Sequence, residues 1–413
     1  MTRCCIVGGG PAGVMLAYML ARTGIDTTLL EEHQDFDRDF RGDTIHPSVL
    51  RILDELGLAE RVLQLRHTKL RDITLQSGDG PVKAVDFSQL RVKYPFVALI
   101  PQAIFLKFMA DEASALPSFH LVMGASVRSL VRENGVVRGV QYRDHVGTHE
   151  VRALLTVAAD GRFSRIRKLA DAKANETSPP MDVLWFKISR RDTDPEGALG
   201  RFGQGHILAM LDRYEYWQVA YVIPKGTYRE LHDAGLEDLR RNVAQLAPEL
   251  SDRVGEIQDW HQISVLSVES DRLQRWYQPG LLFIGDAAHT MSPVGGVGIN
   301  YAIQDAVVTA NELAAPLRSG RMSLADLAGV QRKRELPTRI IQTIQSFLQT
   351  RILSATLRSR GPGTIPPILR ALFNVPQIRV LPARVMGMGF VPVHVSDEIR
   401  GGGDGALADP PAV

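Results

Sequence analysis

The chain opens with an alternation of apolar and glycine-rich stretches that is typical of a strand, a turn, a helix and a second strand. Residues Cys4 to Val7 form a short, continuous apolar run, as in a strand covered on both faces. Apolar positions then recur at helical spacing from Val14 to Ala21, and Gly24 ends this helix before the next apolar run. This order predicts a βαβ unit.

Later segments predict a mixed sheet over the first 170 residues. Helical patterns occupy 47–57 and 102–114, whereas 125–134, 135–144 and 151–160 are strand-like in succession. Successive strands joined by short turns pair antiparallel, so parallel and antiparallel pairs are expected in one sheet.

From about Met181 to Ser270 the pattern changes to a series of strands that predicts an inserted sheet domain. The strand-like segments are 183–190, 202–211, 216–225 and 263–270. A buried strand within 281–289 and a helix from about Ile299 to Leu317 then return to the first domain.

Together these patterns predict an α/β fold with a Rossmann-like mixed-sheet domain, an inserted β-rich domain and C-terminal helices. The expected parts are a first domain in two segments, 1–178 and 276–330, an inserted domain of 179–275, a helical region of 331–395 and a tail of 396–413. We expect the tail to be flexible, because it is rich in glycine and lies at a terminus.

Composition excludes several classes of protein. The 413 residues are 45% hydrophobic and 23% charged, with 48 Lys and Arg against 46 Asp and Glu, which excludes a disordered chain and a globally basic nucleic-acid binder. The only cysteines are adjacent, Cys4 and Cys5, which excludes a disulfide framework and favours a reducing compartment. With neither a signal-peptide pattern nor a membrane-length apolar run, the expected location is cytoplasmic. No metal site is expected.

The first motif with chemical meaning is Gly8-x-Gly10-x-x-Gly13, between the first strand and its helix. The first glycine permits the tight turn, the second lets a pyrophosphate approach the backbone, and the third lets helix and strand pack closely. The N-terminus of the helix then faces the phosphates, and Glu31 at the end of the second strand is placed to bind a ribose. The alternative is a glycine turn without a ligand.

A second motif lies almost three hundred residues further on. Gly285-Asp286 ends an apolar strand, and a glycine-rich loop leads to a helix; the marked positions of this stretch are His289, Pro293, Gly295, Gly296, Gly298 and Asn300. Backbone amides here are again able to face an anion. An extended dinucleotide such as FAD spans two such sites.

At this point the chain resembles the para-hydroxybenzoate hydroxylase family of single-component, FAD-dependent aromatic monooxygenases. Three motifs carry the resemblance: GGGPAG at 8–13, DGRFSRIR at 160–167 and GDAAHTMSPVGGVGIN at 285–300. They span roughly residues 1–320. One departure is Val297, where the family usually has glutamine, so only the backbone argument applies at that position.

The resemblance implies a set of FAD-binding residues: Gly8, Gly10, Pro11, Ala12, Gly13, Glu31, Arg41, Gln102, Val127, Asp160, Asp286, Gly298, Ile299 and Asn300. Within this set, Arg41 corresponds to an arginine beside the phosphates, Gln102 to a ribose or ribityl contact, and Val127 to a strand contacting adenine. Asp160 corresponds to an aspartate with structural and nicotinamide-nucleotide roles, and Asp286 to the aspartate on the ribityl hydroxyls. The alternative for Asp160 is a simple turn.

The implied chemistry needs charge placement and a dry site. Reduced flavin is negative near N1 and C2=O, where the helix start at 298–300 supplies a positive field. O2 then gives a flavin C4a-hydroperoxide, which decays to peroxide if water enters, so an apolar lid is required. The aromatic candidates for that lid are Trp185, Phe202, Tyr214, Tyr216, Trp217 and Tyr221, for which ordinary core packing is the alternative.

Candidate catalytic positions are Pro293 and Gly295, as backbone beside the peroxide, with Thr44 and His46 from the segment expected to run along the flavin. The His46 imidazole is a candidate base for a phenolic substrate. A locally bonded histidine at the start of a helix is the favoured alternative. Only one complete dinucleotide fingerprint is present, so NAD(P)H is expected to bind transiently as the reductant.

The C-terminal region is strongly basic. Between 332 and 390 there is one acid, Glu335, against ten bases: Arg332, Lys333, Arg334, Arg339, Arg351, Arg358, Arg360, Arg370, Arg379 and Arg384. This pattern, with interleaved apolar residues, fits peripheral contact with an anionic membrane. The favoured alternative is a set of helices docked on the flavin domain with arginines directed outward. No nucleic-acid-binding motif accompanies the charge.

We therefore predict an FAD-dependent NAD(P)H:oxygen oxidoreductase that hydroxylates or epoxidises an electron-rich phenol, quinolone or polyketide-like substrate in secondary metabolism. The partners expected are a small hydrophobic aromatic molecule and O2. The alternatives are an FAD-dependent reductase of isoprenoid double bonds and a flavin-binding protein without turnover. A flavin halogenase is disfavoured, because its W-x-W-x-I-P pattern is absent.

Overall fold

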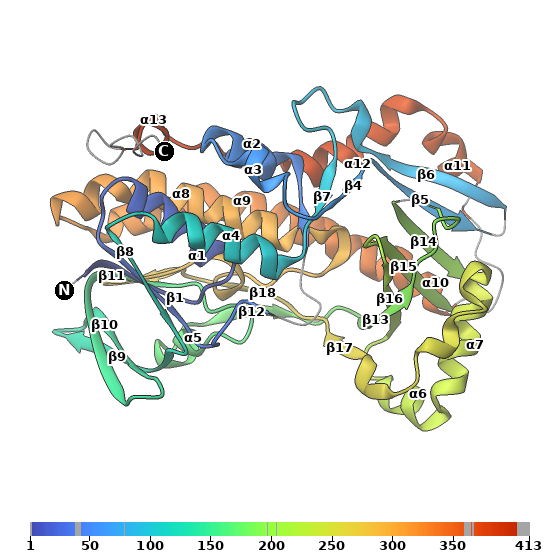
Figure 1. Cartoon of the computed structure of the whole chain (residues 1–413), viewed down its shortest axis with the longest axis horizontal. Helices are drawn as coiled ribbons and strands as arrows, with labels where there is room; N and C mark the ends of the chain where they lie inside the picture. Colours follow the sequence, from blue (N-terminus) through green and yellow to red (C-terminus); the bar gives the residue numbers. More distant parts are fainter. Residues whose placement is uncertain are drawn as a thin grey trace, which may run out of the picture.

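The computed structural model describes residues 2–37, 43–77, 79–195, 197–203, 205–358, 365 and 367–402. Two large sheets lie side by side, and a layer of helices covers the first of them (Figure 1). The expected α/β fold with a mixed sheet is confirmed.

The first sheet has a parallel centre with antiparallel additions. Its strand order is β19-β20-β11-β1-β2-β8, in which the neighbours from β20 to β8 pair in parallel. Their bounds are β1 (Thr2–Val7), β2 (Thr27–Glu31), β8 (Phe119–Met123), β11 (Thr148–Ala158) and β20 (Leu281–Phe283). The antiparallel additions are β9 (Ser126–Glu133), β10 (Val136–Arg143) and β19 (Tyr277–Gln278).

The layer over this sheet contains α1 (Pro11–Arg22), α4 (Gln102–Ser114), α8 (Gly298–Ser319) and α9 (Leu324–Phe347). Helix α1 packs against both α4 and α8, and α9 packs along α8. Leu16 of α1, Leu29 of β2 and Ile303 of α8 are all fully buried in one core. This burial brings the N-terminal and the distant second segment of the first domain into one body.

Shorter elements connect the main ones. Beside the layer lie α2 (Pro47–Glu55), α3 (Ala59–Val62) and a three-stranded sheet of β3 (Thr44–Ile45), β4 (Thr68–Leu70) and β7 (Val97–Leu99). Below the main sheet lie α5 (Arg165–Leu169) and the pair β12 (Ala174–Thr177) and β18 (Ser270–Leu273).

The second sheet is seven-stranded, with the order β17-β13-β16-β15-β14-β5-β6. Its strands are β5 (Asp72–Ser77), β6 (Gly80–Asp86), β13 (Met181–Ser189), β14 (Ala198–Gly203), β15 (His206–Asp212), β16 (Tyr216–Pro224) and β17 (Ser264–Ser267). The expected domain boundaries assign residues 72–86 to the first domain, whereas β5 pairs in parallel with β14. Local pattern does not reveal this partner, because more than a hundred residues separate the two strands.

The two faces of the second sheet have different partners. Leu184, Trp217 and Tyr221 are fully buried on one face and pack with Leu239 of α7 (Leu236–Leu246), which follows α6 (Tyr228–Ala234). On the opposite face, the cluster containing Ala220 packs against Trp185, Val294 and helical residues 353 and 357. The second face therefore looks toward the glycine-rich loop of the first domain.

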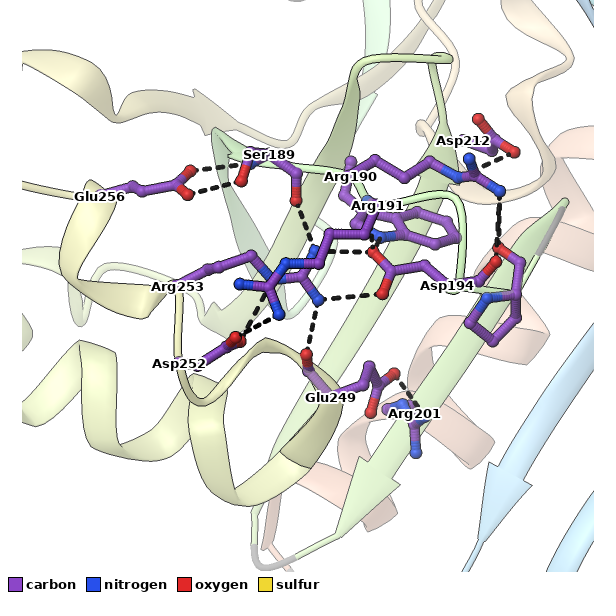
Figure 2. Close-up of polar contacts among 12 residues, drawn as sticks. Ser189, Arg190, Arg191, Asp194, Arg201, Asp212, Glu249, Asp252, Arg253 and Glu256 are labelled. Atoms are coloured by element: carbon purple, nitrogen blue, oxygen red, sulfur yellow. Dashed lines mark hydrogen bonds and ion pairs between the residues drawn. The ribbon is translucent and has the colours of Figure 1, made fainter.

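A buried ion-pair cluster fixes the loop that follows β13 (Figure 2). The Arg253 guanidinium donates to both Asp194 carboxylate oxygens, at 2.7 and 3.0 Å, and the two side chains are only 4% and 6% exposed. Arg253 also donates to the Ser189 carbonyl, and Trp217 Nε1 donates to Asp194. The hydrogen bonds from Arg253 hold the pKa of Asp194 well below its ordinary value. The cluster anchors this loop to the segment after α7.

The C-terminal region docks on the rest of the chain. After α9 come a π-helical stretch, Leu348–Leu353, and then α10 (Ser354–Arg358), α11 (Pro367–Phe373), α12 (Pro376–Met388) and α13 (Asp397–Arg400). The expectation that the arginines point outward is wrong at Arg334, which is fully buried against Asp305 of α8. A buried carboxylate on the partner helix explains the inward orientation. No helix in the described ranges has the length and apolarity needed to cross a membrane.

The expected flexible tail, 396–413, includes residues that form helix α13 in the structure. Arg22 of α1 donates to the carbonyls of Ile399 and Arg400, and the backbone N–H of Val395 donates to Glu55. These bonds hold α13 against the first domain, so the beginning of the expected tail belongs to the folded part of the chain. Residues 403–413 lie outside the described part of the chain.

Candidate functional site

The turn between β1 and α1 has the geometry of a phosphate-binding turn. Gly8 has φ +106°, and a Cβ there would lie 2.4 Å from the Ala159 carbonyl oxygen. A Cβ on Gly13 would lie 1.9 Å from the Gly8 carbonyl oxygen, whereas a Cβ on Gly10 would meet nothing within 4 Å. The glycines at 8 and 13 are thus required by the protein itself, and Gly10 borders open space.

The N-terminus of α1 is available for an anion. Gly10 is the N-cap, Pro11 begins the helix, Ala12 follows, and no side chain caps it. The first backbone N–H groups of a helix lack partners within the helix and carry its positive end. Open space beside Gly10, together with these donors, fits the pyrophosphate of a dinucleotide such as FAD.

Glu31 stands directly beside this turn. Its Oε2 accepts from the Gly9 backbone N–H at 2.7 Å, and its Oε1 accepts from the backbone N–H of His33. The residue is 5% exposed. The carboxylate therefore fixes the turn itself, and a ribose contact by Glu31 remains a proposal.

Asp160 and Val127 are two further residues expected to contact FAD on this side of the site. Asp160 follows β11 next to Gly8, accepts from Ser164 Oγ and from the Ile166 N–H, and burial raises its pKa. The Val127 carbonyl accepts from Arg165. Asp160 thus has the structural half of the role that the resemblance implies.

Gln102 begins α4, and its backbone N–H donates to Asp43 Oδ1 at 3.3 Å. Asp43 also pairs with Arg213, from the β15–β16 turn of the second sheet, at 2.8 Å. Burial raises the pKa of Asp43 despite the opposing effects of Arg213 and the Gln102 N–H. Arg41 lies outside the described residues.

The second motif folds as a short turn, a loop and the start of α8. Gly285 and Asp286 open a 3-10 turn after β20, and the Asp286 carbonyl accepts from Arg167. Gly295 and Gly296 both have positive φ, +83° and +60°. Helix α8 begins at Gly298 and, like α1, has no side-chain cap. Its free N-terminus fits a partly negative group.

Thr44 and Asn300 meet at this loop. Thr44 Oγ1 donates to the Gly296 carbonyl at 2.7 Å. The Asn300 side-chain amide donates to the carbonyls of Thr44 and Gly296, and its Oδ1 accepts from the His46 N–H. The structure therefore brings together three of the expected positions, Thr44, His46 and Asn300, at the loop residue Gly296, from segments about 250 residues apart.

His46 is fully buried at the start of α2. Its Nδ1 donates to the Met386 carbonyl at 2.7 Å, and burial lowers the pKa of His46 to about 4 despite this bond. The imidazole is therefore neutral at pH 7 and fixed by α12. This geometry favours the structural alternative over a general base, although the bond is to a distant helix rather than a local one.

A buried charge cluster near the second motif includes Asp305 and Arg334, which the sequence analysis did not identify as site residues. Asp305 Oδ2 accepts from the Gly285 N–H at 2.9 Å and from His289 Nε2 at 2.6 Å, and Oδ1 accepts from Arg334 at 2.7 Å. Burial by itself raises the pKa of Asp305, but His289 and Arg334 hold it below its ordinary value. The signal that points to Asp305 is an acid within an otherwise apolar helical run, AIQDAVV.

The aromatic lid candidates divide between the two faces of the second sheet. Trp217 and Tyr221 are core residues on the α7 face, and Tyr214 lies in the β15–β16 turn, where its hydroxyl donates to the His67 carbonyl. Trp185 lies on the face toward Val294. Strand pairing places the two remaining candidates, Phe202 and Tyr216, on that same face.

The two glycine motifs converge in space. A Cβ on Gly285 would lie 3.2 Å from Ala12 Cβ, and α8 packs along α1. Two uncapped helix N-termini, distant in sequence, therefore belong to one site. This is the arrangement that an extended dinucleotide requires.

Comparison with known proteins agrees with this geometry. A family described as "FAD binding domain" matches residues 1–342. The 6-methylpretetramide 4-monooxygenase of Streptomyces rimosus is 33% identical over 359 residues, covering 86% of this chain and 85% of the relative.

Solved structures share the fold. One is OxyS anhydrotetracycline hydroxylase from Streptomyces rimosus, with a TM-score of 0.71 and 23% identity over 94% of this chain and 75% of that one. Another is PqsL from P. aeruginosa in complex with 2-aminobenzoylacetate, with a TM-score of 0.74 and 20% identity over 86% of this chain and 97% of that one. The family match and the 33% identical relative confirm the resemblance that the sequence motifs predicted: the chain belongs to the FAD binding domain family and is an FAD-dependent monooxygenase.

Proposed function

We propose that this enzyme uses NAD(P)H and O2 to hydroxylate or epoxidise an electron-rich, fused-ring aromatic substrate of the polyketide or quinolone type. The observation that carries the FAD part is the convergence of the α1 and α8 N-termini, with Gly285 against Ala12. The polyketide class is supported by the names of the 6-methylpretetramide monooxygenase and the anhydrotetracycline hydroxylase.

FAD supplies the redox chemistry when it is bound. The chain supplies positive potential from the α1 N-terminus at the pyrophosphate and from the α8 N-terminus at the flavin pyrimidine edge. Gly298, Ile299 and Asn300 provide the first turn of α8 for that second contact. Thr44 and Asn300 hold the loop at Gly296, so that these donors are fixed before the reaction begins.

The substrate is proposed to lie between this loop and the second sheet. The face of that sheet with Trp185 and Ala220 packs toward Val294, next to Pro293 and Gly295. Apolar side chains there exclude water, which protects an oxygen-transfer reaction from loss as peroxide. No proton transfer is assigned to His46, because it is neutral and buried with its Nδ1 already donating to Met386.

NAD(P)H is proposed to bind only transiently. The first motif is the single complete dinucleotide fingerprint in the sequence, and its geometry serves FAD. Asp160, beside Gly8, is the residue proposed to influence the reductant, in line with the family resemblance.

Peripheral membrane contact is a second proposal, for the C-terminal helices. Ile368 of α11 and Leu381 of α12 are 74% and 63% exposed, in a region that also carries the exposed Arg384. Exposed apolar and basic side chains together favour an anionic lipid surface. Co-sedimentation with phosphatidylglycerol vesicles, and not with phosphatidylcholine vesicles, is expected; equal recovery in the two pellets contradicts it.

The enzymatic proposal is tested with purified protein. We expect flavin absorbance in the visible range and accelerated NAD(P)H oxidation on addition of a fused-ring phenol, with oxygenated product formed in proportion. Screening tetracyclic phenols, quinolones and simple phenols under one condition identifies the class. Protein that binds FAD but oxidises NAD(P)H equally with and without every aromatic contradicts the proposal.

A further inference from the structure

Three glutamines near the C-terminal end of α9 hold one segment of the active-site loop, residues 290–294. Gln342 Nε2 donates to the Thr290 carbonyl at 3.0 Å. Gln345 Nε2 donates to the carbonyls of Ser292 and Val294, at 3.0 and 2.7 Å. Gln349 Nε2 donates to the Ser292 hydroxyl. The carbonyls of alternate residues, 290, 292 and 294, are thus all bonded from α9.

The spacing of the glutamines explains how one helix reaches the whole segment. Positions 342, 345 and 349 differ by three and four residues, so they follow one face of a helix. The segment they reach runs from Thr290 into the 3-10 turn that begins at Val294, with Pro293 in a helical conformation. Gln349 lies in the π-helical stretch after α9, where the helical register is locally widened, a feature often found at functional sites.

Two of these glutamines are buried at positions where apolar residues are the usual choice. Gln345 and Gln349 are 3% and 2% exposed. Burying an amide is unfavourable unless it is hydrogen-bonded, and both partners of Gln345 are carbonyl oxygens, which only its NH2 group is able to satisfy. The family match ends at residue 342, so Gln345 and Gln349 lie beyond the part of the chain that the family model describes.

The held segment contains the position nearest to the expected chemistry. Pro293 lies between the two residues whose carbonyls Gln345 holds, and two residues after Val294 the Gly296 carbonyl accepts from Thr44 and Asn300. The loop is therefore fixed from α9 on one side and from the Thr44 segment and α8 on the other. A shift of about 1 Å in such a loop is enough to lower a reaction rate strongly.

We propose that Gln345, with Gln342 and Gln349, is a positioning residue that fixes Pro293 and Gly295 relative to the flavin and thereby sets how much reduced flavin leads to oxygenated product rather than to H2O2. This inference rests on the proposed monooxygenase function. Gln345 acts through the backbone of the loop and does not itself contact substrate.

The test compares Gln345→Met with Gln331→Met in the FAD-loaded enzyme. Gln331 is a matched control on α9, because it also makes two backbone bonds, but to Gln274 and Trp276 rather than to residues 290–294. For Gln345→Met we expect at least threefold less product per NAD(P)H, a matching rise in H2O2 and an altered visible circular dichroism of the flavin. FAD affinity should stay within threefold of wild type, and Gln331→Met should match wild type in each readout.

A second readout does not depend on any substrate. In hydrogen-exchange mass spectrometry, peptides covering 288–300 should exchange at least tenfold faster in Gln345→Met and stay within twofold of wild type in Gln331→Met. If Gln345→Met fails to fold, Gln342→Met is tested instead, because Gln342 is only half-buried and bonds the same segment at Thr290. Unchanged exchange and unchanged coupling in the Gln345 or Gln342 variant overturn the inference, whereas failure of the proposed function appears as a lack of aromatic turnover in the wild type.

Discussion

The buried ion pair between Arg334 and Asp305 predicts a large loss of stability when the arginine is replaced. Arg334 donates to Asp305 at 2.7 Å, and the two side chains are 1% and 0% exposed. At the preceding residue of the same helix, Lys333 pairs with Glu312 of α8, but these side chains are 59% and 26% exposed. Adjacent positions thus compare a buried and an exposed ion pair between the same two helices.

The magnitudes differ because of solvent. Removing one partner of a buried pair costs about 3–5 kcal/mol, since the remaining charge is left uncompensated. Asp305 keeps His289 and the Gly285 N–H in Arg334→Met, so we expect a loss near about 3 kcal/mol. An exposed pair contributes about 0–1 kcal/mol. Arg334→Met should therefore be less stable than Lys333→Met by at least about 2 kcal/mol, which is roughly thirtyfold in the ratio of folded to unfolded protein.

The assay is urea unfolding of both variants at pH 7 in the same excess of FAD, followed by circular dichroism. The common FAD concentration matters, because a bound ligand stabilises the folded state by mass action. If Arg334→Met unfolds at the same urea concentration as Lys333→Met, with an equal slope, the argument from burial is refuted.

Three further predictions follow from single side chains. Gly10→Val should leave apoprotein stability within about 0.5 kcal/mol of wild type, since a Cβ there meets nothing within 4 Å, but weaken FAD binding at least tenfold in a fluorescence titration; unchanged affinity contradicts the phosphate site. Burial lowers the pKa of His46 to about 4, below the ordinary value near 6.5, so the unfolded chain binds more protons between these values and stability falls as the pH drops from about 6.5 to 4, by on the order of 3 kcal/mol. His46→Gln should flatten that part of the pH–stability curve in urea titrations, and an equally steep curve contradicts the assignment. Asp194→Asn should remove the buried carboxylate partner of Arg253, which keeps the half-exposed Asp252, and cost about 3 kcal/mol, seen as faster proteolysis of the 179–275 region; wild-type resistance would count against it.

The glycine motifs were predictable from sequence because their chemistry is local. Gly8 needs positive φ, and Gly13 lies against Gly8 five residues away, so sequence spacing alone indicates both demands. Predicting that this turn meets Gly285 required a second glycine motif, which the sequence contains at 285–300. Their meeting in the structure follows from the packing of α1 on α8.

The residues that sequence reasoning missed have partners that no local pattern reveals. Arg334 appears in the sequence as one of ten basic residues in the C-terminal region, and only the position of Asp305, 29 residues earlier, makes it a buried one. Gln345 is likewise an ordinary polar helix residue until the loop at 292–294 is placed against it. Helical spacing predicts which residues share a face but not what that face contacts.

The same reasoning explains why the two halves of the site differ in predictability. Flavin binding relies on backbone donors and on glycines, and the need for glycine at a tight turn or close contact is visible in short sequence motifs. The proposed substrate side relies on one face of a seven-stranded sheet, and that sheet is assembled from β5 and β6 as well as from the inserted strands. Trp185 and Trp217 lie on neighbouring strands of this sheet and are both aromatic, yet Trp217 is packed under α7 while Trp185 faces Val294. Strand register therefore decides which aromatic side chains are able to meet a substrate, since a shift of one residue would exchange the two faces.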